Sequence, residues 1–286
     1  MDNILELHQV SKSFPGSGFE LENITFSLPY GTIMGFVGEN GAGKTTTIGC
    51  ILDTIAEYDG TVKLFGKEML DTDVREKIGV VYDGDNFPPY MNASQLSGIM
   101  SGLYKQWDKE LFQKYLHDFN LIPTQKIKHY SKGMTMKLAI AVALSHHPQL
   151  LVLDEATSGL DPVMRDELLD VFLDFVQQED HSILLSSHIT SDLEKIADYI
   201  TFIHNGKLIM SVSKDDLLYN YVVMRCTENQ FLTIDRDDMI AFRKRDYQVD
   251  VMLADGKMAR KKYKDAVIDN VSIEEIMLLL IRGETR

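Results

Sequence analysis

The sequence has few cysteines and far fewer basic than acidic residues, and each shortage excludes a class of protein. Its 286 residues include only Cys50 and Cys226, which stand far apart and fit no metal-ligand spacing. Such cysteine usage favours a reducing compartment over a disulfide-linked secreted fold. With 29 basic against 43 acidic residues the net charge is −14. Sequence-independent binding to nucleic-acid phosphates needs clustered Lys and Arg, so this net charge excludes it.

Long apolar runs are also lacking. The run Ile276–Ile281, for example, is far shorter than the roughly 20 residues of a membrane-spanning helix. The first residues, MDNILELHQVSKSF, carry acids and no basic stretch before an apolar region, so we expect no secretory signal. We therefore expect a cytoplasmic protein, whose membrane role would come from a partner.

Four nearly unbroken apolar runs predict the central strands of a parallel sheet with both faces covered. Each run is followed at once by polar residues, and open α/β sheets bind ligands at such strand ends. Between Phe87 and about Ser145 apolar residues recur at helical spacing, which predicts a helical insertion. The four runs are Ile33–Val37, Ile78–Tyr82, Leu150–Leu153 and Ile183–Leu185.

The two ends of the chain have other patterns. Alternation at Ile24–Leu28 predicts a small antiparallel N-terminal sheet. Asn205-Gly206 predicts a tight hairpin turn that closes the first domain. From Ser211 onward, strand-like segments and a last helix with a capping-box pair, Ser272 and Glu275, predict an α+β appendage in which no chemistry is visible. We expect a nucleotide-binding domain at 1–213, with its helical subdomain at about 87–145, and an accessory domain at 214–286.

The segment Gly38–Thr45, GENGAGKT, follows a predicted strand and fits a phosphate-binding loop. Its glycines let backbone N–H groups surround phosphates, Lys44 balances the β and γ charges, and the Thr45 hydroxyl binds Mg²⁺. Thr46 follows inside a helix whose positive end faces the anion. The expected cofactors are ATP and Mg²⁺, and the expected binding residues are Gly38, Glu39, Asn40, Gly41, Ala42, Gly43, Lys44, Thr45 and Thr46.

Two acids and one histidine follow later strands. Asp154 and Glu155 end the run Leu150–Leu153, where unpaired carboxylates are unfavourable. A bound Mg²⁺ would explain Asp154, and a water to be activated would explain Glu155. His188 follows Ser186-Ser187 and could orient the γ-phosphate and that water. A solvated turn and a packed histidine are the alternatives if these residues are taken alone.

Together these segments resemble the ATPases of ABC transporters. Gly38–Thr45 is similar to Walker A, Leu150–Glu155 to Walker B, Ser158–Asp161 to the D-loop and His188 to the switch histidine. The resemblance covers about residues 2–213. It implies a P-loop NTPase with a RecA-like mixed sheet, an antiparallel β-subdomain and a helical insertion. Glu155, His188 and Lys44 would then be catalytic, and Asp161 would lie near the nucleotide.

Two motifs depart from the family pattern. Tyr130–Met134, YSKGM, stands where the signature motif belongs, with Lys132 and Met134 in place of Gly and Gln. Ser131, Lys132 and Gly133 would contact phosphate, Ser131 as a helix N-cap. Asp83 stands where the Q-loop glutamine belongs, and its carboxylate could still approach Mg²⁺.

Phe14 matches the aromatic residue that stacks on adenine in the family, with Phe19 as a nearby rival and core packing as the alternative. The signature and Asp83 together resemble a Gram-positive bacterial subgroup of phenol-soluble-modulin, peptide and antibiotic-resistance exporter ATPases. We therefore expect the ATP-hydrolysing subunit of an exporter.

The resemblance also implies partners. In the family two such chains face head to tail with ATP between them, as a homo- or heterodimer, and a separate transmembrane permease subunit docks on the helical insertion. The protein would then lie on the inner face of the membrane. Two alternatives stay open: a non-transport ABC ATPase, and a nucleotide-binding regulator whose turnover the altered signature and Asp83 have abolished.

Overall fold

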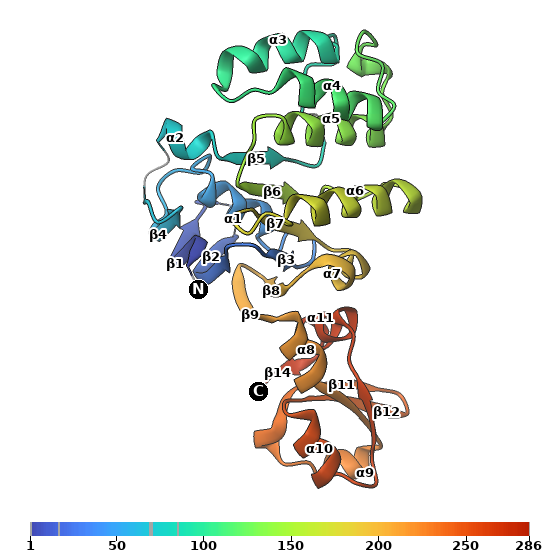
Figure 1. Cartoon of the computed structure of the whole chain (residues 1–286). Helices are drawn as coiled ribbons and strands as arrows, with labels where there is room; N and C mark the ends of the chain where they lie inside the picture. Colours follow the sequence, from blue (N-terminus) through green and yellow to red (C-terminus); the bar gives the residue numbers. More distant parts are fainter. Residues whose placement is uncertain (1, 17, 69–70, 85, 286) are drawn as a thin grey trace.

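The computed structural model describes residues 2–16, 18–68, 71–84 and 86–285, and within them the strands form two sheets (Figure 1). The larger sheet has nine strands in the order β4-β1-β2-β9-β8-β3-β7-β6-β5. Its strands are β1 (Asn3–Ser13), β2 (Glu20–Pro29), β3 (Ile33–Val37), β4 (Asp59–Leu64), β5 (Ile78–Val81), β6 (Leu150–Asp154), β7 (Ser182–Ser187), β8 (Tyr199–His204) and β9 (Lys207–Ser213).

The centre of this sheet is parallel. Strand β3 pairs in parallel with β7 and β8, and β6 pairs in parallel with β5 and β7. Strands β1, β2 and β4 form an antiparallel region, joined to the centre by one parallel pair between Glu22 of β2 and Lys207 of β9. Parallel pairing brings the carboxyl ends of the central strands to one edge.

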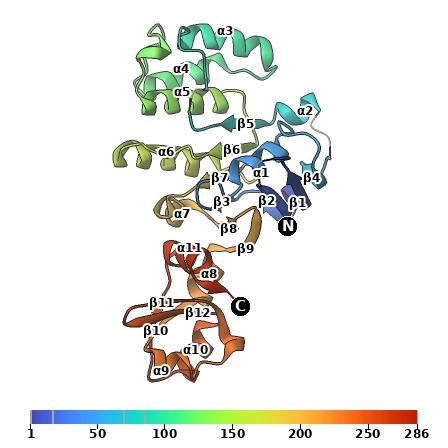
Figure 2. The ribbon, with the colours of Figure 1, turned by 180° about the vertical axis from the view of Figure 1, so that it is seen from behind.

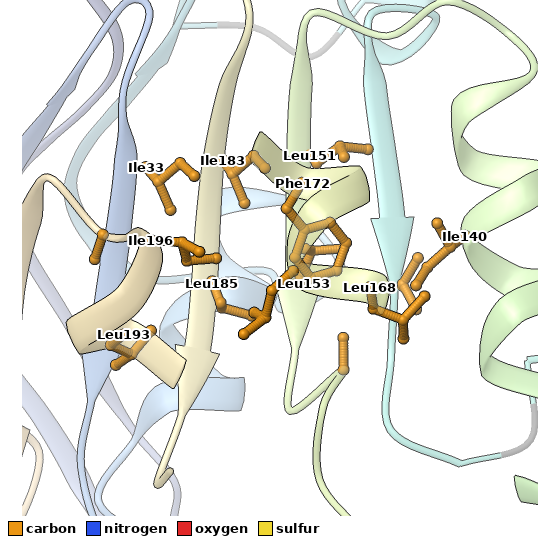
Figure 3. Close-up of a cluster of buried hydrophobic side chains, with 14 of the residues drawn as sticks. Ile33, Ile140, Leu151, Leu153, Leu168, Phe172, Ile183, Leu185, Leu193 and Ile196 are labelled. Carbon is orange, nitrogen blue, oxygen red and sulfur yellow. The ribbon is translucent and has the colours of Figure 1, made fainter. Parts of the chain in front are cut away.

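Helices cover both faces of the central strands, which explains why these strands are apolar throughout. Helix α1 (Lys44–Ile51) packs on one face. On the other face lie α5 (Lys132–Leu144), α6 (Pro162–Phe175) and α7 (Thr190–Ile196). Figure 3 shows the second face, where Leu168 and Phe172 of α6 and Leu193 and Ile196 of α7 surround side chains of the strands.

The helical insertion projects from one end of the molecule (Figures 1 and 2). It contains α3 (Ala93–Leu103), α4 (Lys109–Asp118), the short 3₁₀ helix Ile127–His129 and α5. Helix α3 begins with a capping box between Asn92 and Gln95, a stable helix start. A further short helix, α2 (Thr72–Arg75), precedes β5.

The smaller sheet lies at the opposite end and has the strand order β13-β10-β12-β11-β14. The predicted capping box between Ser272 and Glu275 is present and starts the last helix. The elements are α8 (Lys214–Asn220), β10 (Val222–Cys226), α9 (Glu228–Phe231), a 3₁₀ helix (Arg236–Asp238), β11 (Met239–Arg245), β12 (Gln248–Leu253), α10 (Gly256–Lys262), β13 (Val267–Asn270), α11 (Ile273–Arg282) and β14 (Glu284–Thr285).

Helix α11 joins this sheet to the rest of the molecule. The backbone N–H of Ile273 donates to Glu194 Oε1 of α7 at 2.9 Å. Buried Ile276 and Leu279 of α11 belong to the same apolar cluster as Leu193 and Ile196 of α7. The two sheets therefore share one continuous core through α7.

Helices long and apolar enough to cross a membrane are absent from the described part of the chain.

Candidate functional site

A cavity of about 390 Å³ opens where the loop after β3 enters α1. Its walls come mostly from the predicted phosphate-binding loop, with one residue from the end of β6 and one aromatic ring from before β2. The structure thus brings together residues that are more than 100 positions apart in the sequence, as the pairing of parallel strands requires. The lining residues are Phe19, Glu39, Asn40, Gly41, Gly43, Lys44, Thr45, Thr46 and Glu155.

The loop needs glycine at two of these positions. Gly41 and Gly43 have φ angles of +82° and +114°, which residues with a side chain rarely adopt. A Cβ atom built on Gly41 would meet nothing within 4 Å, so the backbone there borders open space. The carbonyl of Ala42 accepts from the N–H of Gly206 at 2.9 Å, which ties the loop to the β8–β9 hairpin.

Lys44 lies inside the loop rather than in solvent. Its ammonium group donates to the carbonyls of Gly38 at 2.7 Å and Glu39 at 3.3 Å, and it lies 3.0 Å from Glu155 Oε1. The lysine is 5% exposed, so its charge acts at low dielectric, where attraction to an anion is strong. The loop therefore presents a fixed cation to whatever fills the cavity.

Asp154 at the end of β6 accepts two short hydrogen bonds. The Thr45 hydroxyl donates to Oδ2 at 2.7 Å, and the Ser186 hydroxyl donates to Oδ1 at 2.5 Å. A buried carboxylate beside a hydroxyl is a set of hard oxygen donors that suits Mg²⁺ together with phosphate and water oxygens. The described residues contain no group of three or more His, Cys, Asp or Glu side chains that would hold a metal alone. Thr45 and Asp154 therefore suit an Mg²⁺ ion that a bound phosphate would also coordinate.

Tyr82 lies near this carboxylate. Burial raises the pKa of the Tyr82 phenol, and the negative charge of Asp154 raises this pKa further. The phenol therefore stays protonated and adds no negative charge beside Asp154 at neutral pH.

Glu155 is held on both sides. Its Oε1 lies 3.0 Å from Lys44 Nζ, and its Oε2 accepts from His188 Nδ1 at 2.6 Å. Its backbone has φ +53°, a left-handed conformation that is uncommon for a residue with a side chain and is often kept at functional sites. With Nδ1 donating to this carboxylate, Nε2 of His188 is left for another contact.

An aromatic ring closes the other side of the cavity, and it is Phe19 that lines the cavity wall. Phe14, the residue predicted to stack on adenine, lies next to Phe19, with the two ring centroids 6.4 Å apart and the planes tilted by 35°. Lys12 Nζ lies 5.5 Å from the Phe14 centroid. Phe19 therefore lines the cavity, and the stacking of Phe14 on adenine stays a prediction.

The remaining predicted residues lie outside this cavity. Ser131 caps α5 by accepting from the N–H of Met134 at 3.2 Å. Asp161 caps α6 by accepting from the N–H groups of Val163 and Met164. Lys132 and Asp83 form an ion pair with Nζ 2.7 Å from Oδ1. The approach of Asp83 to Mg²⁺ and the contacts of the signature residues with phosphate stay predictions.

Ser186 is a residue of the candidate site that sequence reasoning did not single out. Its hydroxyl binds Asp154, and its hydroxyl and carbonyl oxygens both accept from the N–H of Glu155 at 3.1 Å. The pattern contained a signal, since two serines end an apolar run directly before His188. Which of the two faces Asp154 depends on the register of β6 and β7, where Asp154 stands opposite Ser186.

Comparison with known proteins finds many relatives of one kind. The family model described as ABC transporter matches residues 21–158. The lantibiotic transport ATP-binding protein SrtF of Streptococcus pyogenes is 33% identical over 217 residues, covering 74% of this chain and 92% of the relative. The bacitracin transport ATP-binding protein BcrA of Bacillus licheniformis is 31% identical over 224 residues, covering 76% of this chain and 72% of the relative.

Solved structures of ATP-binding subunits of ABC transporters have a similar fold. An ATP-binding subunit of an ABC transporter superposes with a TM-score of 0.68 at 26% identity, covering 75% of this chain and 91% of that one. A nucleotide-free ATP-binding cassette from an ABC transporter gives 0.63 at 20% identity, covering 74% and 92%. The predicted P-loop NTPase fold with its mixed sheet and helical insertion is confirmed.

Proposed function

We propose, since the chain belongs to the ABC transporter family, that it powers the export of a peptide or toxic amphipathic compound by a separate membrane subunit. The family binds and hydrolyses ATP. The observation that carries the proposal for this chain is Glu155, held between Lys44 and His188 beside a glycine-rich loop. Two relatives named for the transport of bacitracin and a lantibiotic support peptide-like cargo.

ATP would fill the cavity with its phosphates along the loop. The N–H groups of Gly41 to Thr45 and the positive end of α1 would face the phosphate oxygens, and the ammonium group of Lys44 would balance their charge. The predicted Phe14, or its neighbour Phe19, which lines the cavity, would stack on the adenine.

Thr45 and Asp154 would hold Mg²⁺, the Thr45 hydroxyl directly and Asp154 directly or through water. The ion would supply charge that stabilises the negative oxygens of the transferring phosphoryl group. The hydrogen bond of 2.7 Å between Thr45 and Asp154 already holds the two oxygens side by side. Ser186 fixes the orientation of the Asp154 carboxylate. These residues therefore need little rearrangement to accept the ion.

Glu155 would accept a proton from the attacking water, as a general base within hydrogen-bond reach of it. When the phosphates draw Lys44 away, Glu155 Oε1 becomes available to that water, while His188 keeps Oε2 in place. Nε2 of His188 would contact the γ-phosphate or the water. Lys44 would stabilise the charge that spreads over the phosphoryl oxygens.

A second ATPase chain, either a copy or a different protein, would complete the site. In this proposal Ser131, Lys132, Gly133 and Asp161 of one chain face the nucleotide of the other. Ser131, which is exposed, caps the positive end of α5. The permease would dock on the helical insertion at the inner face of the membrane.

The first test is steady-state ATPase activity of the purified chain beside Glu155→Gln. We expect this change to lower turnover by roughly 10²- to 10⁴-fold, since it removes the general base. Size exclusion in ATP and Mg²⁺ should show the variant trapped as a dimer, because binding is kept while hydrolysis is lost.

Glu110→Gln is the matched control, because Glu110 is an exposed residue of α4 and its loss should leave turnover unchanged. Equal, measurable turnover of the wild type and Glu155→Gln would overturn the assignment of the base. Nucleotide binding without turnover in either protein, even with a permease, would favour the catalytically impaired regulator. Co-purification with ribosomes or DNA would favour a non-transport ABC ATPase.

A further inference from the structure

Asp83 and Lys132 depart from the family pattern separately in sequence but meet in space. Asp83 lies in the turn after β5, and Lys132 is the first residue of α5. Lys132 Nζ lies 2.7 Å from Asp83 Oδ1, and the two side chains are 47% and 42% exposed. The pair thus bridges the parallel sheet and the helix that begins with the signature segment Ser131–Gly133.

The lysine side chain also lies across the D-loop. A Cβ atom built on Gly159 would stand 3.2 Å from Lys132 Nζ and 3.6 Å from its Cδ and Cε atoms. A Cβ atom on Gly133 would collide with Met164 of α6. The start of α5 is therefore packed against the D-loop and α6, and the ammonium group is held between Gly159 and the carboxylate of Asp83.

The position of Lys132 is electrostatically unfavourable without an anion. A helix N-terminus carries positive partial charge, and a cation in the first turn is repelled by it. The first turn of α5 contains no acidic residue that would offset this. Asp83 supplies the missing negative charge from another element. Its carboxylate occupies the place that an anionic ligand of Lys132 would take.

We propose that Asp83 is a positioning residue that holds Lys132 and competes with the terminal phosphate of ATP for it. The inference rests on the proposed function, in which Ser131–Gly133 faces the nucleotide bound to the second chain. Lys132 reaches that phosphate only when its pair with Asp83 opens. Asp83 therefore sets how much ATP is needed to bring the two chains together, and it acts through Lys132 rather than on the nucleotide.

The test is a double-mutant cycle in the full chain: wild type, Asp83→Asn, Lys132→Met and the double variant. The readouts are the ATP concentration at half-maximal ATPase rate and, in a Glu155→Gln background, at half-maximal dimerisation. Asp83→Asn should lower both by about 1.5- to 5-fold, the range that loss of an exposed ion pair allows. Lys132→Met should raise both, and the double variant should match Lys132→Met.

Two results would overturn the inference. A higher ATP requirement in Asp83→Asn, accompanied by a higher Mg²⁺ requirement, would mean that Asp83 serves the metal instead. An equal effect of Asp83→Asn with and without Lys132 would mean that the two act independently. Asp73→Asn is the matched control, because it breaks another exposed ion pair, with Lys105, and should change neither readout.

If the proposed function itself is wrong, the result is different, because no variant would then dimerise in ATP. Labelling of Lys132 by an amine-reactive ester, followed by mass spectrometry, decides the inference in that case. Asp83→Asn should speed the labelling of Lys132 but not of Lys105. An unchanged labelling rate would overturn the proposed pairing.

Discussion

Ser186 holds both acidic residues at the end of β6, since its hydroxyl donates to Asp154 and accepts from the N–H of Glu155. Replacing it by alanine leaves the buried Asp154 oxygen without this donor. A hydrogen bond to a charged group contributes about 1.5–3 kcal/mol, so its loss is large for a single hydroxyl.

We expect Ser186→Ala to raise the Mg²⁺ concentration for half-maximal ATPase activity by roughly tenfold or more, because an unrestrained carboxylate binds the ion less well. Ser182→Ala is the matched control: it removes another buried hydroxyl from β7, one that donates to the carbonyl of Pro29. The Mg²⁺ dependence of the two variants is compared by titration. Equal shifts would mean that general loosening of β7, and not the contact with Asp154, is responsible.

For single residues, the sequence predicted which residue types form the site better than which side chains they contact. The glycine loop, Lys44 and Thr45 could be identified because their spacing is local. The aromatic ring on the cavity and the pair of Asp83 with Lys132 could not, because each depends on where separate segments meet. A choice between Phe14 and Phe19 needs the side-chain directions before β2, which periodicity does not give.

Among the elements, the four apolar runs became β3, β5, β6 and β7 within about two residues at each end. They were visible because strands buried on both faces carry apolar side chains without interruption. Strands β11 and β13 were not predicted. Both lie toward the edges of the smaller sheet, and apart from buried Ala241 of β11 they mix exposed and half-buried residues, so neither pattern stands out.

His146, which follows α5, links that helix to the start of β5. Its Nε2 lies 3.2 Å from the carbonyl oxygen of Ile78, and its ring stacks on Tyr104 with centroids 4.0 Å apart. The residue is 2% exposed, and this burial lowers the pKa of the imidazole below its ordinary value of 6.5. The neutral ring is therefore the form that stabilises the junction between the insertion and the sheet.

The sign of the pH effect follows from this lowered pKa. Below pH 6.5 the unfolded chain binds a proton at His146 that the folded chain resists, so the free energy of unfolding falls by up to about 1.4 kcal/mol per pH unit. His146→Phe keeps an aromatic ring and cannot titrate. We expect it to be about 1 kcal/mol less stable at neutral pH, through the lost hydrogen bond, and less sensitive to acid.

The measurement is urea unfolding of both proteins at about pH 7.5 and pH 5.5. His117→Phe is the control, because His117 lies exposed on α4 and its loss should leave the pH dependence unchanged. A wild type and a His146→Phe variant that lose equal stability in acid would show that His146 does not carry the effect.

For the whole molecule, the sequence predicted a division near residue 213 but not how the two parts meet. The contact depends on α11, the last helix, packing beside α7, which begins two residues after His188. Distant segments of this kind cannot be paired from periodicity. Because Ile276 and Leu279 share a core with Leu193 and Ile196, we expect the two sheets to unfold together rather than in separate steps.

The two cysteines allow a direct test, since Cys50 lies in α1 and Cys226 in β10. Both thiols are buried, and burial raises the pKa of Cys50 to about 11 and also raises that of Cys226. Both thiols should be unreactive until the part of the protein around each of them unfolds. Labelling with a thiol reagent across a urea series should give one midpoint for both cysteines.

Ile276→Ala should move both midpoints to lower urea together, because removal of a fully buried isoleucine side chain lowers stability by about 2–5 kcal/mol. Met258→Ala, on the exposed face of α10, should move neither. If Cys226 instead reacts at lower urea than Cys50, and Ile276→Ala shifts Cys226 alone, the smaller sheet opens independently. In that case the contact between α7 and α11 could not transmit stability from the C-terminal sheet to the segment that carries His188.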